Sequence, residues 1–351
     1  MSVSERGTAP LIDPMGASRV AAAEAGLRLA FPDDRDTLLL DRPCAPLDAR
    51  VSRGLGREQR LAAQAAGPGV LVPSHRGIDS SRLLLSVDGQ PPSMMLKVIH
   101  LDQRIFFDAE ASFDAQRKAA ALGCAPDILA FDVTRAAWVS QFLGDWATAR
   151  VSDLKRPELL DAVIRAKRKI HAGPRFKSSW SVFDRIRMLN TACTPVVADA
   201  PGDLPVLLDT VGRIERMIAA AGVDEVPAHA DGLASNILIG PSDRIQLVDF
   251  DEARNVDPYY EFALLANEVF ENEEDYLLAL EMFEGQARQA SFRRARLYAM
   301  ADDLAWALWG IFMDATSPRK EVEFYRYACW RLIRCRTALQ GVDLDLYARS
   351  I

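Results

Sequence analysis

The sequence lacks the features of membrane and secreted proteins. It has no run of about 18 apolar residues, the length that a membrane-spanning helix needs. Its first residues include Glu5 and Arg6 but not the apolar core of a secretory signal. The five cysteines are scattered, with no Cys-x-x-Cys pair and no histidine at metal-ligand spacing, which is typical of free thiols in a reducing compartment. We therefore expect a cytoplasmic protein with no membrane insertion.

Excess basic charge and a P-loop are also missing. The net charge of −7 argues against a nucleic-acid partner, because a phosphate backbone attracts basic surfaces. No Gly-x-x-x-x-Gly-Lys-Ser/Thr segment occurs, which excludes the enzymes that hold nucleotide phosphates in a P-loop. What remains is a chain of 351 residues, long enough for one large domain or two lobes, with no internal repeat.

The most informative segment begins at His229. Asp231, Asn236 and Asp249 follow one another around two short apolar strands that a Gly-Pro-Ser-Asp turn connects, and this hairpin would bring Asp249 beside Asn236. Phosphoryl transfer needs a carboxylate that orients the attacking hydroxyl and oxygen ligands that hold Mg²⁺ on the nucleotide. An Asp-rich loop before an ordinary strand is the alternative. Three polar residues at these offsets instead favour a catalytic base, Asp231, and a metal pair, Asn236 and Asp249.

Breakers and periodicity divide the chain into three parts. We expect an N-terminal extension of unknown role over residues 1–45, a nucleotide-binding lobe over 46–144, and a helical lobe with the catalytic loop and acceptor pocket over 145–351. Helices are predicted over 18–29, 48–66 and 108–122, and strands over 70–72, 83–87, 94–99, 128–131 and 137–143. In the last part, helices are predicted over 157–171, 204–221, 261–271, 275–286, 291–312 and 320–339. The predicted fold class is α+β, a small antiparallel sheet followed by a mainly helical lobe.

Lys97 is the first candidate for nucleotide binding. It lies in the apolar strand 94–99, where an ammonium group needs a partner because its burial is costly. Nucleotide phosphates and an ion pair with Glu110, or as second choice with Asp114, would meet that need. An edge strand whose lysine faces water is the alternative.

Two further segments of the first lobe are candidates for contact with the nucleotide. Backbone groups of Gln141, Phe142 and Leu143 lie where a hinge between lobes would meet the adenine. The loop that would cover the phosphates has a single glycine, so the hydroxyls of Ser80 and Ser81 are its candidate ligands.

Aromatic residues recur at spacing of three in the last two predicted helices. Trp306 and Trp309 share one helix face, and Phe324, Tyr327 and Trp330 share another. Aromatic faces attract quaternary ammonium groups with about 0.5–2 kcal/mol per contact. The carboxylates of Asp302 and Asp303, one turn earlier, would add to this attraction. A plain helix–helix core is the alternative interpretation.

Taken together, these motifs resemble the choline/ethanolamine kinase family, within the aminoglycoside-phosphotransferase-like group of protein-kinase-like folds. The His-x-Asp-x-x-x-x-Asn segment and the Asp-Phe-Asp segment at 249–251 resemble the wider group, and the stretches 305–311 and 321–328 resemble the choline kinase tail. The resemblance covers residues 70–340 and implies a two-lobed fold. It also implies transfer of phosphate from ATP, with Mg²⁺, to a small cationic alcohol, with choline as first candidate and ethanolamine as second.

The resemblance also implies roles for individual residues. His229 would brace the catalytic loop, Trp306, Trp309 and Tyr327 would form the choline cage, and Phe324 stands where a tyrosine is expected. Glu252 replaces an aromatic residue and would add a negative charge for the cation, and Glu268 lies where the family often has an acidic residue. Glu261 replaces an aspartate that steadies the catalytic loop. Other acceptors (an aminoglycoside, thiamine) and a pseudokinase that only binds ligands stay open as alternatives.

Overall fold

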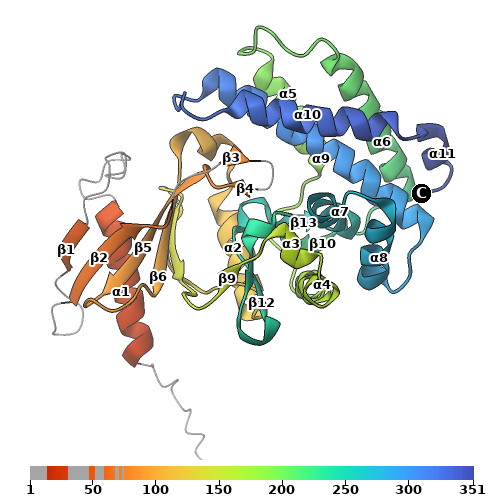
Figure 1. The fold of residues 1–351 in the computed structure, drawn as a ribbon. Coiled ribbons are helices and arrows are strands. Elements are labelled where there is room, and N and C mark those ends of the chain that lie inside the picture. The colour runs from red at the N-terminus through yellow and green to blue at the C-terminus, as the bar shows by residue number, and fades with distance from the viewer. Residues whose placement is uncertain (1–13, 31–46, 52–58, 68–70, 73–74) are drawn as a thin grey trace, which may run out of the picture. The chain divides into compact units, whose positions relative to one another are not determined.

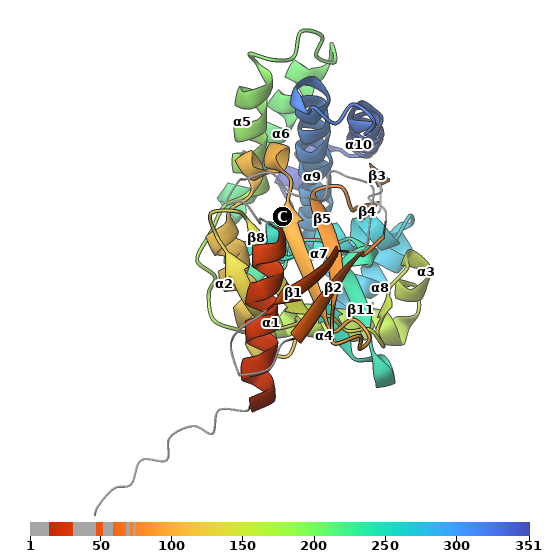
Figure 2. The same cartoon turned by 90° about the vertical axis from the view of Figure 1, so that its left-hand side faces the viewer.

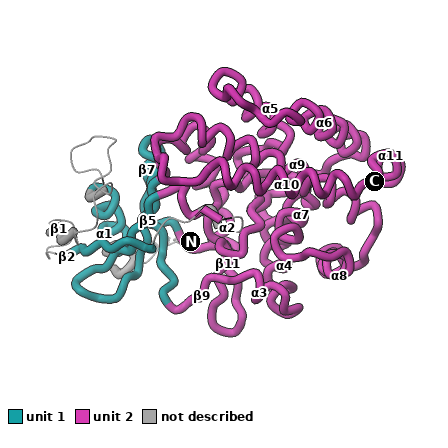
Figure 3. Tube along the Cα trace, turned by 45° about the horizontal axis from the view of Figure 1, so that its top comes forward, with its two compact units in different colours: residues 1–67, 81–98, 128–144 teal, residues 68–80, 99–127, 145–351 magenta. Residues whose placement is uncertain are grey.

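The computed structural model describes residues 14–30, 47–51, 59–67, 71–72 and 75–351. Contacts divide the chain into two compact units (Figure 3). Unit 1 comprises residues 1–67, 81–98 and 128–144, and unit 2 comprises residues 68–80, 99–127 and 145–351. Within the described ranges, none of the helices has the length and apolar character needed to cross a membrane.

Unit 1 is built around a six-stranded sheet with the order β1-β2-β5-β6-β8-β7 (Figure 1). Strands β2 and β5 pair antiparallel, as do β6 and β8. The bounds are Leu47–Val51 (β1), Gln59–Ala65 (β2), Ser80–Val87 (β5), Met94–Ile99 (β6), Ile128–Asp132 (β7) and Ala137–Gln141 (β8). The small antiparallel sheet predicted from the sequence is thereby confirmed.

The helix predicted over residues 48–66 is wrong, because this segment contributes β1 and β2. Its Ala, Arg, Gln and Leu content favours a helix, but Leu61, Ala63 and Ala65 also alternate with the period of a strand. Leu61 is buried in the core of unit 1, and Ala63 pairs with Leu85 of β5. Pairing and burial therefore override the local helical preference.

The helix α1 (Pro14–Ala30) contacts β7 and β8 of the same unit (Figure 2). Its buried face consists of small residues, Ala22, Ala23 and Ala25. A Cβ at Gly26 would lie 2.6 Å from Cδ1 of Leu85, so a larger residue here would require the Leu85 side chain to move. Part of the expected N-terminal extension is thus built into the core of unit 1.

Unit 2 is mainly helical, as predicted. Its helices are α2 (Ala109–Ala121), α3 (Val151–Leu154), α4 (Pro157–His171), α5 (Val182–Cys193), α6 (Leu204–Ala221), α7 (Pro258–Val269), α8 (Glu273–Glu284), α9 (Gln289–Thr316), α10 (Phe324–Gln340) and α11 (Leu344–Ala348). Helix α5 was not predicted from the sequence. Its N-terminus carries a capping box formed by Ser181 and Asp184. Helix α2 contacts η5 (Phe250–Glu252) and β13 (Arg254–Val256), which groups it with unit 2 although we expected it in the first lobe.

Short strands of unit 2 position the catalytic segment. The pairs are β10 (Val226–Ala228) with β13 and β11 (Ile237–Ile239) with both β12 (Ile245–Leu247) and β9 (Ala147–Thr148); β3 (Leu71–Val72) pairs with β4 (His75–Arg76). The core is centred on α9, whose residues 297–313 are all buried. It packs against α5, α7 and α10, since a helix that is apolar on every side needs neighbours on every side.

Candidate active site

The segment from His229 to Asn236 is held at both ends by strand pairs, β10 with β13 and β11 with β12. Ala230 has a left-handed backbone (φ 55°), which turns the chain just before Asp231. Asp231 is 7% exposed, and its Oδ1 accepts a hydrogen bond from the N–H of Leu233 at 2.7 Å. The turn therefore holds this carboxylate in one orientation.

A buried ion pair supports the turn. Lys167 of α4 donates from Nζ to the backbone oxygen of Asp231 (2.9 Å) and to Oε1 of Glu261 on α7 (3.0 Å). The same Glu261 oxygen accepts from the N–H of Ala230 (3.0 Å), and its second oxygen bonds to Nε2 of His171. Complete burial alone would raise the pKa of Glu261, but the charges of Lys167 and His171 lower it. This glutamate is therefore ionised and reaches the loop directly.

His229 joins the catalytic turn to the hairpin. It is buried, with Nε2 2.9 Å from the backbone oxygen of Val248 and Nδ1 3.3 Å from that of Asp231. Burial and the nearby charge of Lys167 lower its pKa, so the ring is neutral at pH 7 and donates through the shorter contact to Val248. Its edge packs on Phe250 with ring centroids 4.7 Å apart, which fixes the hairpin end against the loop.

Asn236 and Asp249 lie at the open end of the β11–β12 hairpin. The N–H of Val248 donates to the backbone oxygen of Asn236 at 3.0 Å, which places Asn236 next to the strand end that carries Asp249. Asp249 has a left-handed backbone (φ 68°) that turns the chain out of the strand. An amide oxygen and a carboxylate are ligand types that Mg²⁺ prefers, so this donor set fits the predicted metal pair.

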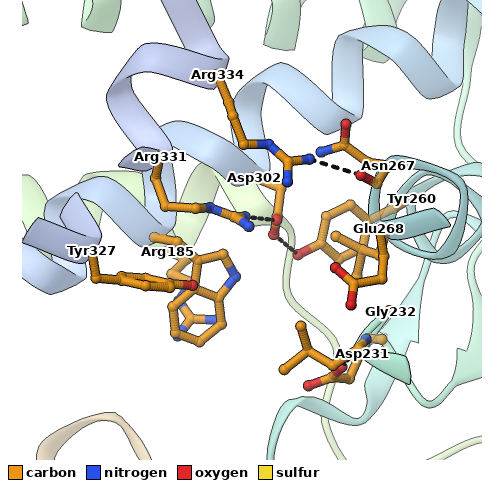
Figure 4. Close-up of a pocket in the computed structure, with 14 residues that line it drawn as sticks. Arg185, Asp231, Gly232, Tyr260, Asn267, Glu268, Asp302, Tyr327, Arg331 and Arg334 are labelled. Carbon is orange, nitrogen blue, oxygen red and sulfur yellow. Dashed lines mark hydrogen bonds and ion pairs between the residues drawn. The ribbon is translucent and has the colours of Figure 1, made fainter. Parts of the chain in front are cut away.

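A pocket opens beside Asp231 (Figure 4). Three of the predicted acceptor residues line it, namely Trp306, Tyr327 and Glu268. The other lining residues come from the catalytic turn and from α5, α7, α9 and α10: Arg185, Ala230, Gly232, Leu233, Tyr260, Leu264, Asn267, Asp302, Arg331 and Arg334. The carboxylate predicted to be the base therefore belongs to the wall of this pocket.

Residues 70–299 of the chain match the phosphotransferase enzyme family, APH. The chain belongs to this family. None of the curated proteins compared with it matches.

Several solved structures are similar to this phosphotransferase. A choline/ethanolamine kinase family protein from Mesorhizobium loti is 22% identical, with a TM-score of 0.66 over 76% of this chain and 88% of that one. The choline kinase LicA from Streptococcus pneumoniae, also solved in complex with AMP, is 16% identical, with a TM-score of 0.67 over 80% and 94%. The aminoglycoside phosphotransferase APH(2")-IIa, solved with streptomycin and ATP, is 14% identical, with a TM-score of 0.53 over 81% and 93%. At these identities the likeness shows the fold, which confirms the protein-kinase-like architecture.

The aromatic wall of the pocket differs from the predicted cation cage. The guanidinium carbon of Arg185 lies 3.9 Å from the ring centroid of Trp306, so an internal cation covers one face of this ring. Glu252, expected to face the acceptor, instead forms ion pairs with Arg185 (2.5 Å) and Arg254 (3.5 Å) and is not among the lining residues. Its charge is thus engaged within the protein, because a buried carboxylate needs a partner.

The other two predicted cage residues lie behind this wall. Trp309 is 1% exposed, and its ring packs edge-on against Trp306, Tyr327 and Phe324. Its Nε1 donates to Gln103 at 3.2 Å. Phe324 is also 1% exposed. The structure places Trp309 and Phe324 in the core, where they support Trp306 and Tyr327.

The end of the pocket near α10 carries arginines that the sequence interpretation missed. Arg331 donates from Nη2 to Asp302, and its Nε lies 3.0 Å from Asp303. Arg334 lies 3.4 Å from Asp303 and donates from Nη2 to the backbone oxygen of Asn267 at 2.9 Å. Burial alone would lower the pKa of Arg331, but Asp303 and Asp302 raise it, so it is charged. The sequence did contain an indication of this pair, because two arginines three residues apart on a helix share one face.

Glu268 lies between the two ends of the pocket. Its Oε1 lies 3.5 Å from the N–H of Ala234, which makes at most a weak hydrogen bond. Burial and the negative charge of Asp231 raise the pKa of Glu268 to about 7, despite that contact and the positive charges of Arg334 and Arg331. Near neutral pH this carboxyl group is therefore partly protonated and can donate a hydrogen bond as well as accept one.

In unit 1, Lys97 is 4% exposed, and its Nζ lies 4.9 Å from the ring centroid of Trp138. Its strand β6 lies between β5 and β8, which excludes the alternative of an edge strand. Glu110 belongs to unit 2, where its carboxylate pairs with Lys177. The pair of Lys97 with Glu110 stays a prediction.

The other nucleotide candidates are placed at strand ends. Gln141 ends β8, and the N–H of Phe142 donates to Ser93 at 3.0 Å, so the sheet unit already uses this donor of the expected hinge; Leu143 follows it. Ser80 and Ser81 begin β5 and thus lie in a strand, not in the loop we expected. The preceding residues 73–74 of that loop lie outside the described ones.

Proposed function

We propose that the phosphotransferase moves the terminal phosphate of ATP to the hydroxyl of a small alcohol bound in the pocket. The observation that carries this proposal is the position of Asp231. It is fixed by Leu233 and Lys167 within the catalytic turn, and it also lines the pocket where an acceptor would bind. A positioned carboxylate next to an acceptor hydroxyl is the arrangement that kinase chemistry needs.

ATP as donor is supported by the structural neighbours that were solved with AMP or ATP. Lys97 of unit 1, buried in β6, is our candidate for binding the nucleotide phosphates, the role that a strand lysine has in kinases. Asn236 and Asp249 would hold Mg²⁺, which when bound neutralises charge on the phosphates.

In the proposed reaction the acceptor hydroxyl donates its proton to the carboxylate of Asp231 while its oxygen attacks the terminal phosphorus. The new oxygen–phosphorus bond forms as the bond between the terminal phosphorus and the bridging oxygen breaks. The electron pair of the broken bond stays on the bridging oxygen, which leaves as part of ADP. Most of the rate gain would come from positioning, since Glu261, Lys167 and His229 hold the base before the acceptor arrives.

Choline and ethanolamine are the acceptors suggested by the names of the neighbours, and Trp306, Tyr327 and Glu268 line the pocket as they would in a cation site. One observation weighs against a quaternary ammonium group, namely Arg185 on the face of Trp306. The general function therefore rests on Asp231, and the class of acceptor depends on the other residues that line the pocket.

The test is ATP consumption with Mg²⁺ over a panel of acceptors, in the wild type and in Asp231→Asn. Asparagine keeps an oxygen that can accept from Leu233 but is a far weaker base, so we expect kcat to fall by about 10²- to 10⁴-fold with ATP binding retained. Asp243→Asn, an exposed change in the β11–β12 turn, is the matched control. Turnover in Asp231→Asn equal to that of the control would refute the role of Asp231. ATP binding without turnover on any acceptor would favour the pseudokinase alternative.

A further inference from the structure

We propose that the acceptor is an acidic alcohol, a small molecule that carries a carboxylate or a phosphate in addition to the hydroxyl that receives the phosphoryl group. This inference rests on the proposed function for the transfer step. It concerns the end of the pocket formed by α5 and α10, where Arg185, Arg331 and Arg334 line the wall.

The first observation is that the protein supplies its own cation to the aromatic wall. Arg185 is 5% exposed, covers a face of Trp306 and is held there by Glu252. A quaternary ammonium group would have to displace this guanidinium or bind beside a like charge. Both are unfavourable, because like charges repel each other. The wall thus discriminates against the cationic acceptors that a bare tryptophan face would attract.

The second observation is that the two arginines of α10 retain donors. A guanidinium group has five N–H donors. Arg331 donates from Nη2 to Asp302 and has its Nε 3.0 Å from Asp303, and Arg334 donates from Nη2 to the backbone oxygen of Asn267. Among the described residues, neither Nη1 has a protein acceptor. Arg331 is 6% exposed and Arg334 is partly exposed, and their guanidinium groups match the planar geometry of a carboxylate or the oxygens of a phosphate.

The third observation is that the pocket has two chemically different ends. Figure 4 shows Arg331 and Arg334 at one end and Asp231 at the other, with Glu268 between them. An acceptor whose hydroxyl lies at Asp231 would therefore place its far end toward the arginines. Asp302, which Tyr260 and Arg331 both contact, keeps these groups in place before binding, so little ordering is required when an anion arrives.

Matched pairs of small molecules test the acidic group directly. Glycerol would be compared with glycerate and with glycerol 3-phosphate, and ethanolamine with serine, which is ethanolamine with an added carboxylate. Binding would be measured by calorimetry at millimolar concentrations, and phosphoryl transfer by ATP consumption with Mg²⁺. We expect the acidic member of a pair to bind more tightly and to be the better acceptor. Comparing glycerate with glycerol 3-phosphate shows whether the site prefers a carboxylate or a phosphate.

An arginine variant tests which side chain binds the acidic group. Arg334→Gln removes one guanidinium at a partly exposed position, so the fold should be retained. We expect Kd for the acidic acceptor to rise about tenfold, as for loss of one charge-assisted hydrogen bond, with binding of its neutral partner unchanged. Arg336→Gln, two residues along α10 and paired with Asp203 away from the pocket, is the matched control and should change neither.

The outcomes separate this inference from the proposed function. Equal or tighter binding of the neutral or amine-only molecules, no binding of any acid, or no response to Arg334→Gln would overturn the inference, even if the enzyme phosphorylates choline. Tight binding of acids that depends on Arg334, without ATP turnover that depends on Asp231, would uphold the anion site and refute the proposed function.

Discussion

Glu261→Gln should destabilise the protein by about 3 kcal/mol. The carboxylate is fully buried and paired with Lys167, whose side chain is 2% exposed. Removing one partner of a buried ion pair costs about 3–5 kcal/mol, because the other charge remains buried without compensation. We take the lower end, since the glutamine oxygen can still accept from the N–H of Ala230, which now bonds to Oε1.

The same change should also slow catalysis, because Lys167 and Ala230 connect Glu261 to the turn that holds Asp231. Unfolding by urea, followed by tryptophan fluorescence, gives the free energy of unfolding, and ATP consumption gives kcat. Glu323→Gln, which removes an exposed ion pair with Arg326, is the control and should cost less than about 1 kcal/mol.

The difference in stability between wild type and Glu261→Gln should depend on pH in a defined direction. The pKa of Glu261 is lowered in the folded state, so its contribution to stability is present above the pKa of the unfolded chain, about 4.3, and is lost as the pH falls toward the folded value. The gap between wild type and Glu261→Gln should therefore be largest near pH 7 and shrink below about pH 4.3. A loss no larger than that of Glu323→Gln, or a gap that grows as the pH falls, would refute the ion-pair argument.

Two further substitutions probe the walls of the site. Gly232→Ala would bring a Cβ to 2.3 Å from the backbone of Leu264, which cannot yield as a side chain would, so we expect a loss of about 3 kcal/mol or more in unfolding experiments and a large fall in kcat. Glu268→Gln removes a carboxyl group whose pKa is raised to about 7, so the folded wild type loses stability as the pH rises from about 4.3, where this group ionises in the unfolded chain, to about 7. The variant should gain up to about 3 kcal/mol over wild type at pH 8 and little at about pH 4, and an equal effect at both would refute the assignment.

The local structure around the proposed catalytic residues could be predicted from the sequence because it is encoded at short range. Asp231, Asn236 and Asp249 are brought together by one hairpin, and a hairpin can be identified from two apolar runs and a turn. The ion pair that supports this turn was harder to predict from the sequence. Lys167 and Glu261 come from α4 and α7, and a lysine within an amphipathic helix gives no sign that it is 2% exposed and paired with a distant carboxylate.

The sheet unit was predicted in outline and was wrong where two preferences compete. Residues 59–65 read equally as a helix or as a strand, and only the pairing of β2 with β5 decides between them. The contribution of α1 could not be predicted either, because a helix of alanines has no strong apolar face and its packing depends on how closely a sheet can approach.

The pocket wall shows where a resemblance in sequence does not predict a side-chain contact. Glu252 stands where the family resemblance implies an aromatic ring, and the sequence alone suggested a negative charge that faces the ligand. A carboxylate that is mostly buried must be compensated, and Arg185 on α5 provides the compensation at 2.5 Å. That guanidinium then covers Trp306. The change from a ring to an acid at one position and the presence of a cation on the aromatic wall are therefore one physical change, and it turns a wall that would attract cations into one that carries its own. An acidic residue that replaces a cage aromatic should first be examined for the buried cation that pairs with it, and only then for its charge toward a substrate.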